Sequence, residues 1–496
     1  MTRTSLLARN TLYNLLGQAA PFVAILIALP LLTQRLGAAR FGVLGIAWVV
    51  LGYFGLFDLG LGRVITKVIA EKLGVGARKD INDVIWTGLG FMLLIGLTML
   101  LLLFLLAPVL ADSLLKIPPE LQHESLIAFK LLAFSVPFVI LTSGLRAILE
   151  AYQRFGVVNI IRTINGVLLY VAPLAVLPFT VSIHYIVLSI VAVRFLVFVL
   201  YALVCSRSVE DMHKPALRRR LIKPMLQLGG WMSVSNIIGP VMVYFDRFLI
   251  GVWLSVTAVT YYVTPYELVS KLLFVTAAFV RVLFPAFSMS LQADAAQAAT
   301  LYSRSIRLLL VLFFPITLAV LFFARPGMTL WPNADFAAKG AGVMQWLAIG
   351  IFANAPGQVA FAAIQAAGRP DITAKIHLIE TPIYLLTLYL FVQHFGIVGA
   401  AMAWAGRLLI ETCLLFMFAE KLIGRAALQF GKFKLLFSGS TLLFLMLTLF
   451  GSSLLSMSLF LALLLFALVL FWFLLVQSED KQLMVNALTR LRQRGV

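Results

Sequence analysis

Residues 84–107 read VIWTGLGFMLLIGLTMLLLLFLLA and contain no charged side chain. A helix of this length rises about 36 Å, which exceeds the roughly 30 Å hydrocarbon core of a bilayer. Similar apolar blocks follow one another from Tyr13 to Val476, separated by short loops. Each block is expected to be helical, because lipid offers the backbone no hydrogen-bonding partner. The chain is therefore predicted to be an all-α polytopic membrane protein.

The composition supports this class of protein. Of the 496 residues, 62% are hydrophobic and 12% are charged, about half the charged fraction of a typical soluble protein. The net charge of +19 does not indicate nucleic-acid binding, because membrane proteins gather basic residues in the loops on one side. Cys205 and Cys413 both fall in apolar blocks, so neither a disulfide framework nor a metal site is predicted.

The hydrophobic pattern predicts about 14 transmembrane helices. Their ranges are 12–33, 41–62, 84–107, 126–146, 163–181, 184–205, 226–246, 260–281, 308–325, 341–363, 377–393, 397–419, 435–452 and 455–477. With the N-terminus in the cytoplasm, and with the span-end residues Arg146, Arg281 and Arg325 counted with the adjoining segments, inside segments hold 29 of the 39 Lys and Arg residues and outside loops hold 6. This positive-inside asymmetry predicts an even number of spans with both termini cytoplasmic.

The two halves of the chain resemble each other. A shift of 215 positions places Leu149–Arg154 over Ile364–Arg369, and a shift of 213 places Arg194 over Arg407. These matches predict two parallel six-helix repeats. The predicted domains are a first lobe at 1–205, a basic cytoplasmic linker at 206–225, a second lobe at 226–419, and two extra helices with a basic tail at 420–496.

Soluble catalytic signatures are missing from the sequence. It contains no G-x-x-x-x-G-K-[ST] phosphate-binding loop and no H-E-x-x-H zinc motif. The loops are also too short for a catalytic domain. The sequence therefore predicts no catalytic residue, no metal site and no cofactor.

The informative residues are the charges inside the predicted spans. Such a charge costs roughly 2.5–3.5 kcal/mol near the bilayer centre, so it normally faces a cavity or a partner. The candidate substrate-cavity cations are Arg194, Lys271 and Arg407. The candidate ion-coupling carboxylates are Glu267 and Glu411. Further intramembrane charges are Asp58, Lys130, Asp246, Arg247 and Glu380.

Structural interpretations of these charges remain open. Glu267 with Lys271, and Arg407 with Glu411, are spaced four apart and could form ion pairs that offset each other's burial cost. Charges near the ends of spans could instead extend to the membrane surface. Arg194 is central in its span and has no acidic residue within four positions. It is therefore the leading candidate for gripping a phosphate with its planar fork.

Several short motifs are spread along the chain. They are Asn14, Gly17, Pro30, Leu36–Gly37, Phe41–Gly42, Asp58–Arg63, Tyr244–Gly251, Gly368–Asp371 and Phe395–Ala401. Together they resemble the polysaccharide-biosynthesis membrane proteins, the O-antigen and lipid-linked oligosaccharide flippases of the multidrug/oligosaccharidyl-lipid/polysaccharide exporter superfamily. The resemblance implies a V-shaped, two-lobed bundle that alternates between inward-open and outward-open states.

The resemblance also implies a function. The expected substrate is a polyprenyl-diphosphate-linked oligosaccharide, moved from the inner to the outer leaflet of the bacterial inner membrane. Coupling to H⁺ or Na⁺ through Glu267 or Glu411 is a separate expectation, because intramembrane carboxylates often relay protons. A polysaccharide polymerase or ligase is an expected partner. One alternative is a multidrug/cation antiporter on the same scaffold, in which acidic residues would dominate the cavity. The alternative from another class is a membrane-embedded glycan polymerase or ligase. Membrane lipids are expected partners in every case, and nucleic acid in none.

Overall fold

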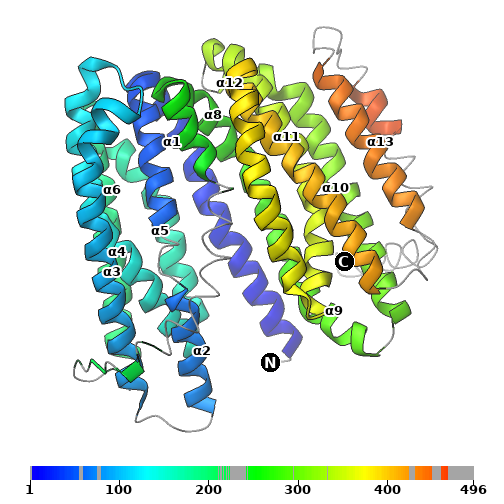
Figure 1. Ribbon diagram of the computed structural model, residues 1–496, viewed down its shortest axis with the longest axis horizontal. Coiled ribbons are helices and arrows are strands. Elements are labelled where there is room, and N and C mark those ends of the chain that lie inside the picture. The colour runs from blue at the N-terminus through cyan, green and yellow to red at the C-terminus, as the bar shows by residue number, and fades with distance from the viewer. Residues whose placement is uncertain are drawn as a thin grey trace, which may run out of the picture. The chain divides into compact units, whose positions relative to one another are not determined.

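The computed structural model describes residues 3–54, 60–74, 80–209, 242–293 apart from 243, 295–331, 333–423, 430–449 and 460–466, with a few single residues between 212 and 223. Nearly all of these residues are helical, and no strand occurs among them (Figure 1). Nine helices in the described parts are long and apolar enough to cross a membrane. The predicted all-α membrane fold is confirmed.

The chain divides into two compact units. Unit 1 comprises Met1–Leu268 with Leu388–Ala400, and unit 2 comprises Val269–Thr387 with Ala401–Val496. The predicted domain boundaries at 205, 225 and 419 stay predictions, because this division rests on packing and not on repeat homology.

Unit 1 contains most of the N-terminal helices. They are α1 (Arg3–Phe54), α2 (Leu61–Gly74), α3 (Ile81–Val109) with a π-helical turn at Leu110–Leu114, α4 (Pro119–Ala151), α5 (Phe155–Val176), α6 (Ile183–Ser208) and α8 (Val256–Val269). Residues 244–253 are also helical. Within this unit α4 packs against α2, α3 and α6, while α5 packs against α1 and α6 (Figure 1).

Unit 2 begins with a 3-10 turn at Ser270–Leu272. Its helices are α9 (Leu273–Ala293), α10 (Ala295–Leu330), α11 (Ala334–Ala366), most of α12 (Pro370–Ile423) and α13 (Phe430–Leu449). Helix α11 packs against α9 and α10, and α13 packs against α10 and α11. Because α11 is covered on several sides, it is the most buried of the apolar helices described here.

Two long helices each hold two predicted spans. Helix α1 turns at Gly37, whose φ of 72° lies in the left-handed region, and α12 turns at Gly396, whose φ is 59°. Glycine adopts this conformation without the steric cost that a side chain brings. Each long helix is therefore two helices joined by one residue, which agrees with the predicted pairs 12–33 with 41–62 and 377–393 with 397–419.

The predicted loops were too long in two places. Residues 63–83 were expected to form a loop, but α2 occupies Leu61–Gly74. Residues 282–307 were also expected to form a loop, yet α9 and α10 run through most of them. Backbone hydrogen bonding continues past the apolar segment, so hydropathy alone underestimates helix length. The predicted span 455–477 lies outside the described residues except for 460–466, and span 226–246 is described only from residue 242, without residue 243.

The surface of α3 shows its membrane environment. Leu94, Leu101 and Leu105 are each more than half exposed, whereas Ile85 and Met92 on the same helix are buried. A water-soluble protein rarely exposes such a continuous row of leucines. This face of α3 therefore contacts lipid.

Helices α1 and α8 approach each other closely at one glycine. A Cβ atom on Gly42 would lie 1.8 Å from the carbonyl oxygen of Val256, so no side chain fits at this position. Thr260 on α8 also donates a hydrogen bond to the carbonyl oxygen of Ala38, at 2.5 Å. The second residue of the Phe41–Gly42 motif thus has a packing function.

The ends of α4 and α11 are built alike. Gln153 and Gly368 both have positive φ, 58° and 74°, and they occupy matching positions under the 215-residue shift. The amide of Arg154 donates to the carbonyl of Leu149 at 2.9 Å, and the amide of Arg369 donates to that of Ile364 at 3.2 Å. The local structure therefore agrees with the sequence repeat at this helix end.

Candidate functional site

A cavity of about 300 Å³ lies within unit 1, lined by α1, α4, α5, α6 and Tyr244. Three arginines contribute to its wall: Arg146 from α4, Arg162 from α5 and Arg194 from α6. None of its lining residues is acidic. We call this site the arginine cavity. Its charge favours an anion, because three arginines line the cavity and no acidic residue does.

Arg194 is held in the cavity by one neutral contact. Its Nη1 donates to Oδ1 of Asn165 on α5 at 3.2 Å, and its Nε is buried without a hydrogen-bond partner among the described residues. Because Asn165 is uncharged, it orients the guanidinium without neutralising it. This leaves Arg194 able to bind a phosphate at two points.

The other two arginines lie near one end of the cavity. Arg146 is one turn and a half before the end of α4, and Arg162 is two turns into α5. Arg146 lies 3.7 Å from Glu150, and both side chains are substantially exposed. Such an exposed pair is weak, so Arg146 remains available to a ligand. The three arginines thus extend from the α4–α5 turn to the middle of α6.

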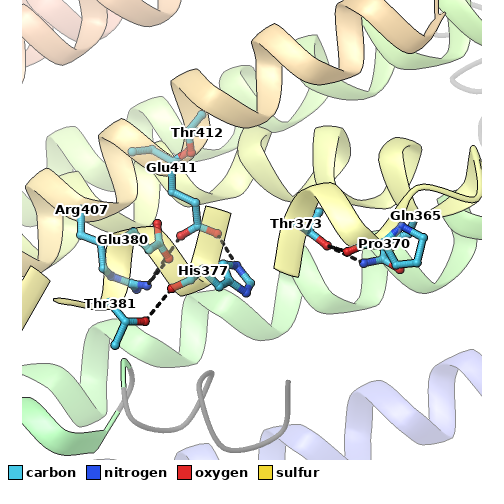
Figure 2. A network of polar contacts seen from close by, with 10 residues as sticks. Gln365, Pro370, Thr373, His377, Glu380, Thr381, Arg407, Glu411 and Thr412 are labelled. Carbon is cyan, nitrogen blue, oxygen red and sulfur yellow. Dashed lines mark hydrogen bonds and ion pairs between the residues drawn. The ribbon is translucent and has the colours of Figure 1, made fainter. Parts of the chain in front are cut away.

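A second group of charges lies in unit 2, on the two halves of α12. Nε2 of His377 lies 3.2 Å from Oε1 of Glu411, while Nη1 of Arg407 lies 3.3 Å from Oε1 of Glu380 and 3.7 Å from Oε2 of Glu411. Figure 2 shows the four side chains converging on one point between the two helical segments. We call His377, Glu380, Arg407 and Glu411 the acid–base cluster.

The two carboxylates of the acid–base cluster are almost fully buried, whereas His377 is partly exposed. Glu380 is 7% exposed and Glu411 is 5% exposed, and Oε2 of Glu380 has no hydrogen-bond partner among the described residues. The ring of His377 stacks on Phe361, with centroids 6.4 Å apart. Two carboxylates, an imidazole and one fixed guanidinium allow the cluster to gain or lose a proton while remaining compensated.

The same cluster has some features of a cation site. One ligand atom each from His377, Glu380 and Glu411 lies within 4.8 Å of the others. Arg407 already supplies a positive charge to both carboxylates. A metal ion would have to compete with that guanidinium, so the geometry fits a proton better than a resident metal.

Arg247 lies in a third, aromatic environment in unit 1. It is 2% exposed, and its guanidinium carbon lies 3.6 Å from the ring centroid of Tyr266 and 5.3 Å from that of Tyr244. Asp246 is fully buried and accepts a hydrogen bond from the hydroxyl of Tyr262 at 2.6 Å. The structural interpretation that charges near span ends extend to the membrane surface does not hold for Arg247, because the tyrosine rings cover it. It does not hold for Glu380 either, because this side chain is buried and paired with Arg407.

The remaining predicted residues are spread over both units. Glu267 on α8 accepts a hydrogen bond from the hydroxyl of Tyr170 at 3.0 Å, and Lys271 lies in the 3-10 turn that follows α8. Lys271 lies 5.9 Å from the ring of Phe274, and Lys130 lies 5.4 Å from that of Phe104. Asp58 falls outside the described residues.

The structure brings together some predicted residues and adds others. It joins Arg407, Glu411 and Glu380 in one cluster in unit 2 and places Arg194 in unit 1. Sequence reasoning missed His377, although its spacing of three from Glu380 places both on one helical face.

Arg146, Arg162 and Asn165 were also missed as cavity residues. The two arginines were counted only as basic residues at the ends of spans. No sequence signal showed that three helices would bring them to one cavity.

Comparison with known proteins gives the family. Residues 31–331 match the family model of the polysaccharide biosynthesis proteins. A curated protein of Shigella flexneri, named "Putative O-antigen transporter", is 31% identical over 407 residues, covering 82% of this chain and 96% of that protein.

The fold is also shared with solved transporters. The inward-facing structure of a multidrug resistance MATE transporter of the MOP superfamily has a TM-score of 0.68 at 15% identity, covering 83% of this chain and 98% of that one. A MOP superfamily transporter from Pyrococcus furiosus, described as having a binding pocket of reversed polarity, has a TM-score of 0.53 at 15% identity, with 82% and 95% covered. By its match over more than half of its length and by this relative, the chain belongs to the polysaccharide biosynthesis protein family and is a multi-pass membrane transporter with the MATE fold.

Proposed function

We propose that this protein is a flippase for a polyprenyl-diphosphate-linked oligosaccharide, an O-antigen or exopolysaccharide repeat unit. The single observation that carries the proposal is the arginine cavity, in which Arg146, Arg162 and Arg194 meet without an acidic residue in the wall. A diphosphate is a compact anion with several acceptor oxygens, which match the planar donors of arginine.

The charge of the arginine cavity distinguishes a flippase for an anionic substrate from a multidrug/cation antiporter with the same fold. A cavity for cationic drugs would be expected to present carboxylates, whereas the arginine cavity presents cations. The buried carboxylates of this protein that pair with Arg407 lie in the other unit. We therefore favour an anionic substrate over a multidrug/cation antiporter.

The proposed orientation follows from the basic residues. With both termini in the cytoplasm, the α4–α5 turn faces the cytoplasm, and the arginine cavity receives its substrate from the inner leaflet. Reporter fusions at Gly74 and at Pro119 should lie on the cytoplasmic and outer sides of the bacterial inner membrane, respectively. Fusions on the same side would contradict this topology.

Energy for transport would come from ion coupling at the intramembrane carboxylates. Glu411 and Glu380 in the acid–base cluster, and Glu267 beside Tyr170, are the candidate sites for H⁺ or Na⁺. Intramembrane carboxylates commonly relay ions in transporters. The flipped unit would then pass to a polymerase or ligase on the outer side.

Analysis of lipid-linked sugars in a strain lacking the protein tests the function. We expect complete lipid-linked repeat units to accumulate on the inner leaflet, protected from an impermeant glycan-modifying reagent. A plasmid-borne wild-type copy should restore export. Normal translocation with unpolymerised units on the outer side would refute the proposal and point to a defect after flipping.

A further inference from the structure

Asn165 holds the position in the first half of the chain that Glu380 holds in the second. We infer that this neutral residue is the determinant that keeps the arginine cavity selective for anions. The inference rests on the proposed function, because it assumes that the cavity receives a diphosphate. It adds a residue that no sequence motif identified.

The alignment of the two positions comes from the helix ends. The 215-residue shift that matches the left-handed residues Gln153 and Gly368 also matches the first residues of α5 and α12, Phe155 and Pro370. Carried ten residues further along both helices, it places Asn165 over Glu380.

The contacts at the two positions correspond. Asn165 accepts from Nη1 of Arg194 at 3.2 Å, and Glu380 accepts from Nη1 of Arg407 at 3.3 Å. Arg194 and Arg407 were themselves matched by the internal repeat, with a shift of 213. Each unit therefore contains an arginine at a matched position, and a residue of the preceding helical segment accepts a hydrogen bond from it. The two units differ in the charge of that accepting residue, which is neutral Asn165 in one and Glu380 in the other.

The difference in charge decides what each arginine can bind. Glu380 and Glu411 together offset the charge of Arg407, so this arginine has little positive field to offer a ligand. Asn165 provides a similar hydrogen bond but no negative charge, and Nε of Arg194 stays buried without a partner among the described residues. The guanidinium of Arg194 thus keeps its positive charge for an anion.

A neighbouring position follows the same trend. The shift of 215 places Arg162, which lines the arginine cavity, over His377 of the acid–base cluster. The first half carries a permanent cation where the second carries a titratable group. Two matched positions therefore give the first half more positive charge.

Two substitutions at Asn165 separate selectivity from a structural role. Asn165→Asp keeps the size and the acceptor but adds the negative charge found in the second half. Asn165→Ala removes the acceptor but adds no charge. If Asn165 only positions Arg194, Asn165→Asp should keep its affinity for the diphosphate and Asn165→Ala should lose it. If Asn165 sets the charge of the arginine cavity, Asn165→Asp should lose affinity and Asn165→Ala should keep it.

The experiment uses the full-length protein in detergent with farnesyl diphosphate as the probe. We expect Asn165→Asp to weaken binding at least tenfold and Asn165→Ala to remain within about threefold of wild type. Thermal unfolding and gel filtration identify any variant that fails to fold. If Asn165→Asp fails to fold, it is replaced by Asn165→Glu, which introduces the residue found at the matched position 380.

The outcomes distinguish the inference from the function on which it rests. Wild-type affinity in Asn165→Asp, or a loss in Asn165→Ala as large as in Asn165→Asp, would overturn the inference and leave the diphosphate site standing. No binding of farnesyl diphosphate to the wild-type protein would overturn both. A tenfold loss confined to the acidic variants would support the assignment.

Discussion

Replacement of Arg194 by Ala and by Lys gives the most direct test of the arginine cavity. A hydrogen bond to a charged group contributes about 1.5–3 kcal/mol. Lys keeps the charge but loses the planar two-point contact, which corresponds to about one such bond. We therefore expect Arg194→Lys to reduce export roughly 10- to 150-fold, since about 1.4 kcal/mol is a factor of ten. Arg194→Ala also loses the charge and should abolish export.

The structural cost of the same change should be small. Arg194 makes one hydrogen bond to a neutral partner, Asn165, at 3.2 Å. The loss of one hydrogen bond to a charged group costs about 1.5–3 kcal/mol, and Ala also removes a buried charge, so the Ala variant should still insert and fold.

The assay measures export of lipid-linked sugar and, in parallel, the amount of protein in the membrane. Export that falls while protein abundance stays constant supports substrate binding. Export and abundance that fall together would assign Arg194 a structural role, and wild-type export by Arg194→Ala would remove the residue from the mechanism.

Three further predictions concern stability, each measured by thermal unfolding of the purified protein. Arg407→Ala leaves Glu380 and a second carboxylate buried without their cation and should lower the free energy of unfolding by about 3–5 kcal/mol. Adding Glu380→Gln to this variant should recover part of that stability. If the two substitutions instead destabilise the protein additively, the pairing is contradicted. Gly42→Ala should lower the melting temperature, because its Cβ would lie 1.8 Å from a carbonyl oxygen, whereas Gly406→Ala, which meets no atom within 4 Å, should not. A Cβ at Gly368 would meet no atom within 4 Å, but the φ of 74° is unfavourable for Ala, so Gly368→Ala should lower the free energy of unfolding by about 1 kcal/mol. An unchanged melting temperature would argue against the left-handed helix end.

The fold class followed from the sequence because membrane insertion is governed by local properties. A block such as residues 84–107 is apolar and long enough to cross lipid whatever surrounds it. Paired spans were also predictable at Gly37 and Gly396, where a short polar or glycine-containing segment separates two apolar blocks. Helix ends were predicted less well, since α2 is amphipathic and escapes a hydropathy criterion.

The candidate sites were predicted only in part. Arg194, Arg407 and Glu411 stood out because each is a charge within an apolar span, which is a property of the sequence. His377 and Asn165 did not stand out in this way, since neither carries a permanent charge. Their importance appeared through their partners, Glu411 and Arg194.

The sequence by itself determined that this protein crosses the membrane many times and which family it resembles, while the cytoplasmic side of its basic loops stays a prediction. The tertiary structure alone decided that Arg146, Arg162 and Arg194 line one cavity and that Arg247 is covered by tyrosine rings. The physical reason is the range of the interactions. Insertion depends on about 20 consecutive residues, whereas a cavity depends on how helices far apart in the chain rotate and pack against one another.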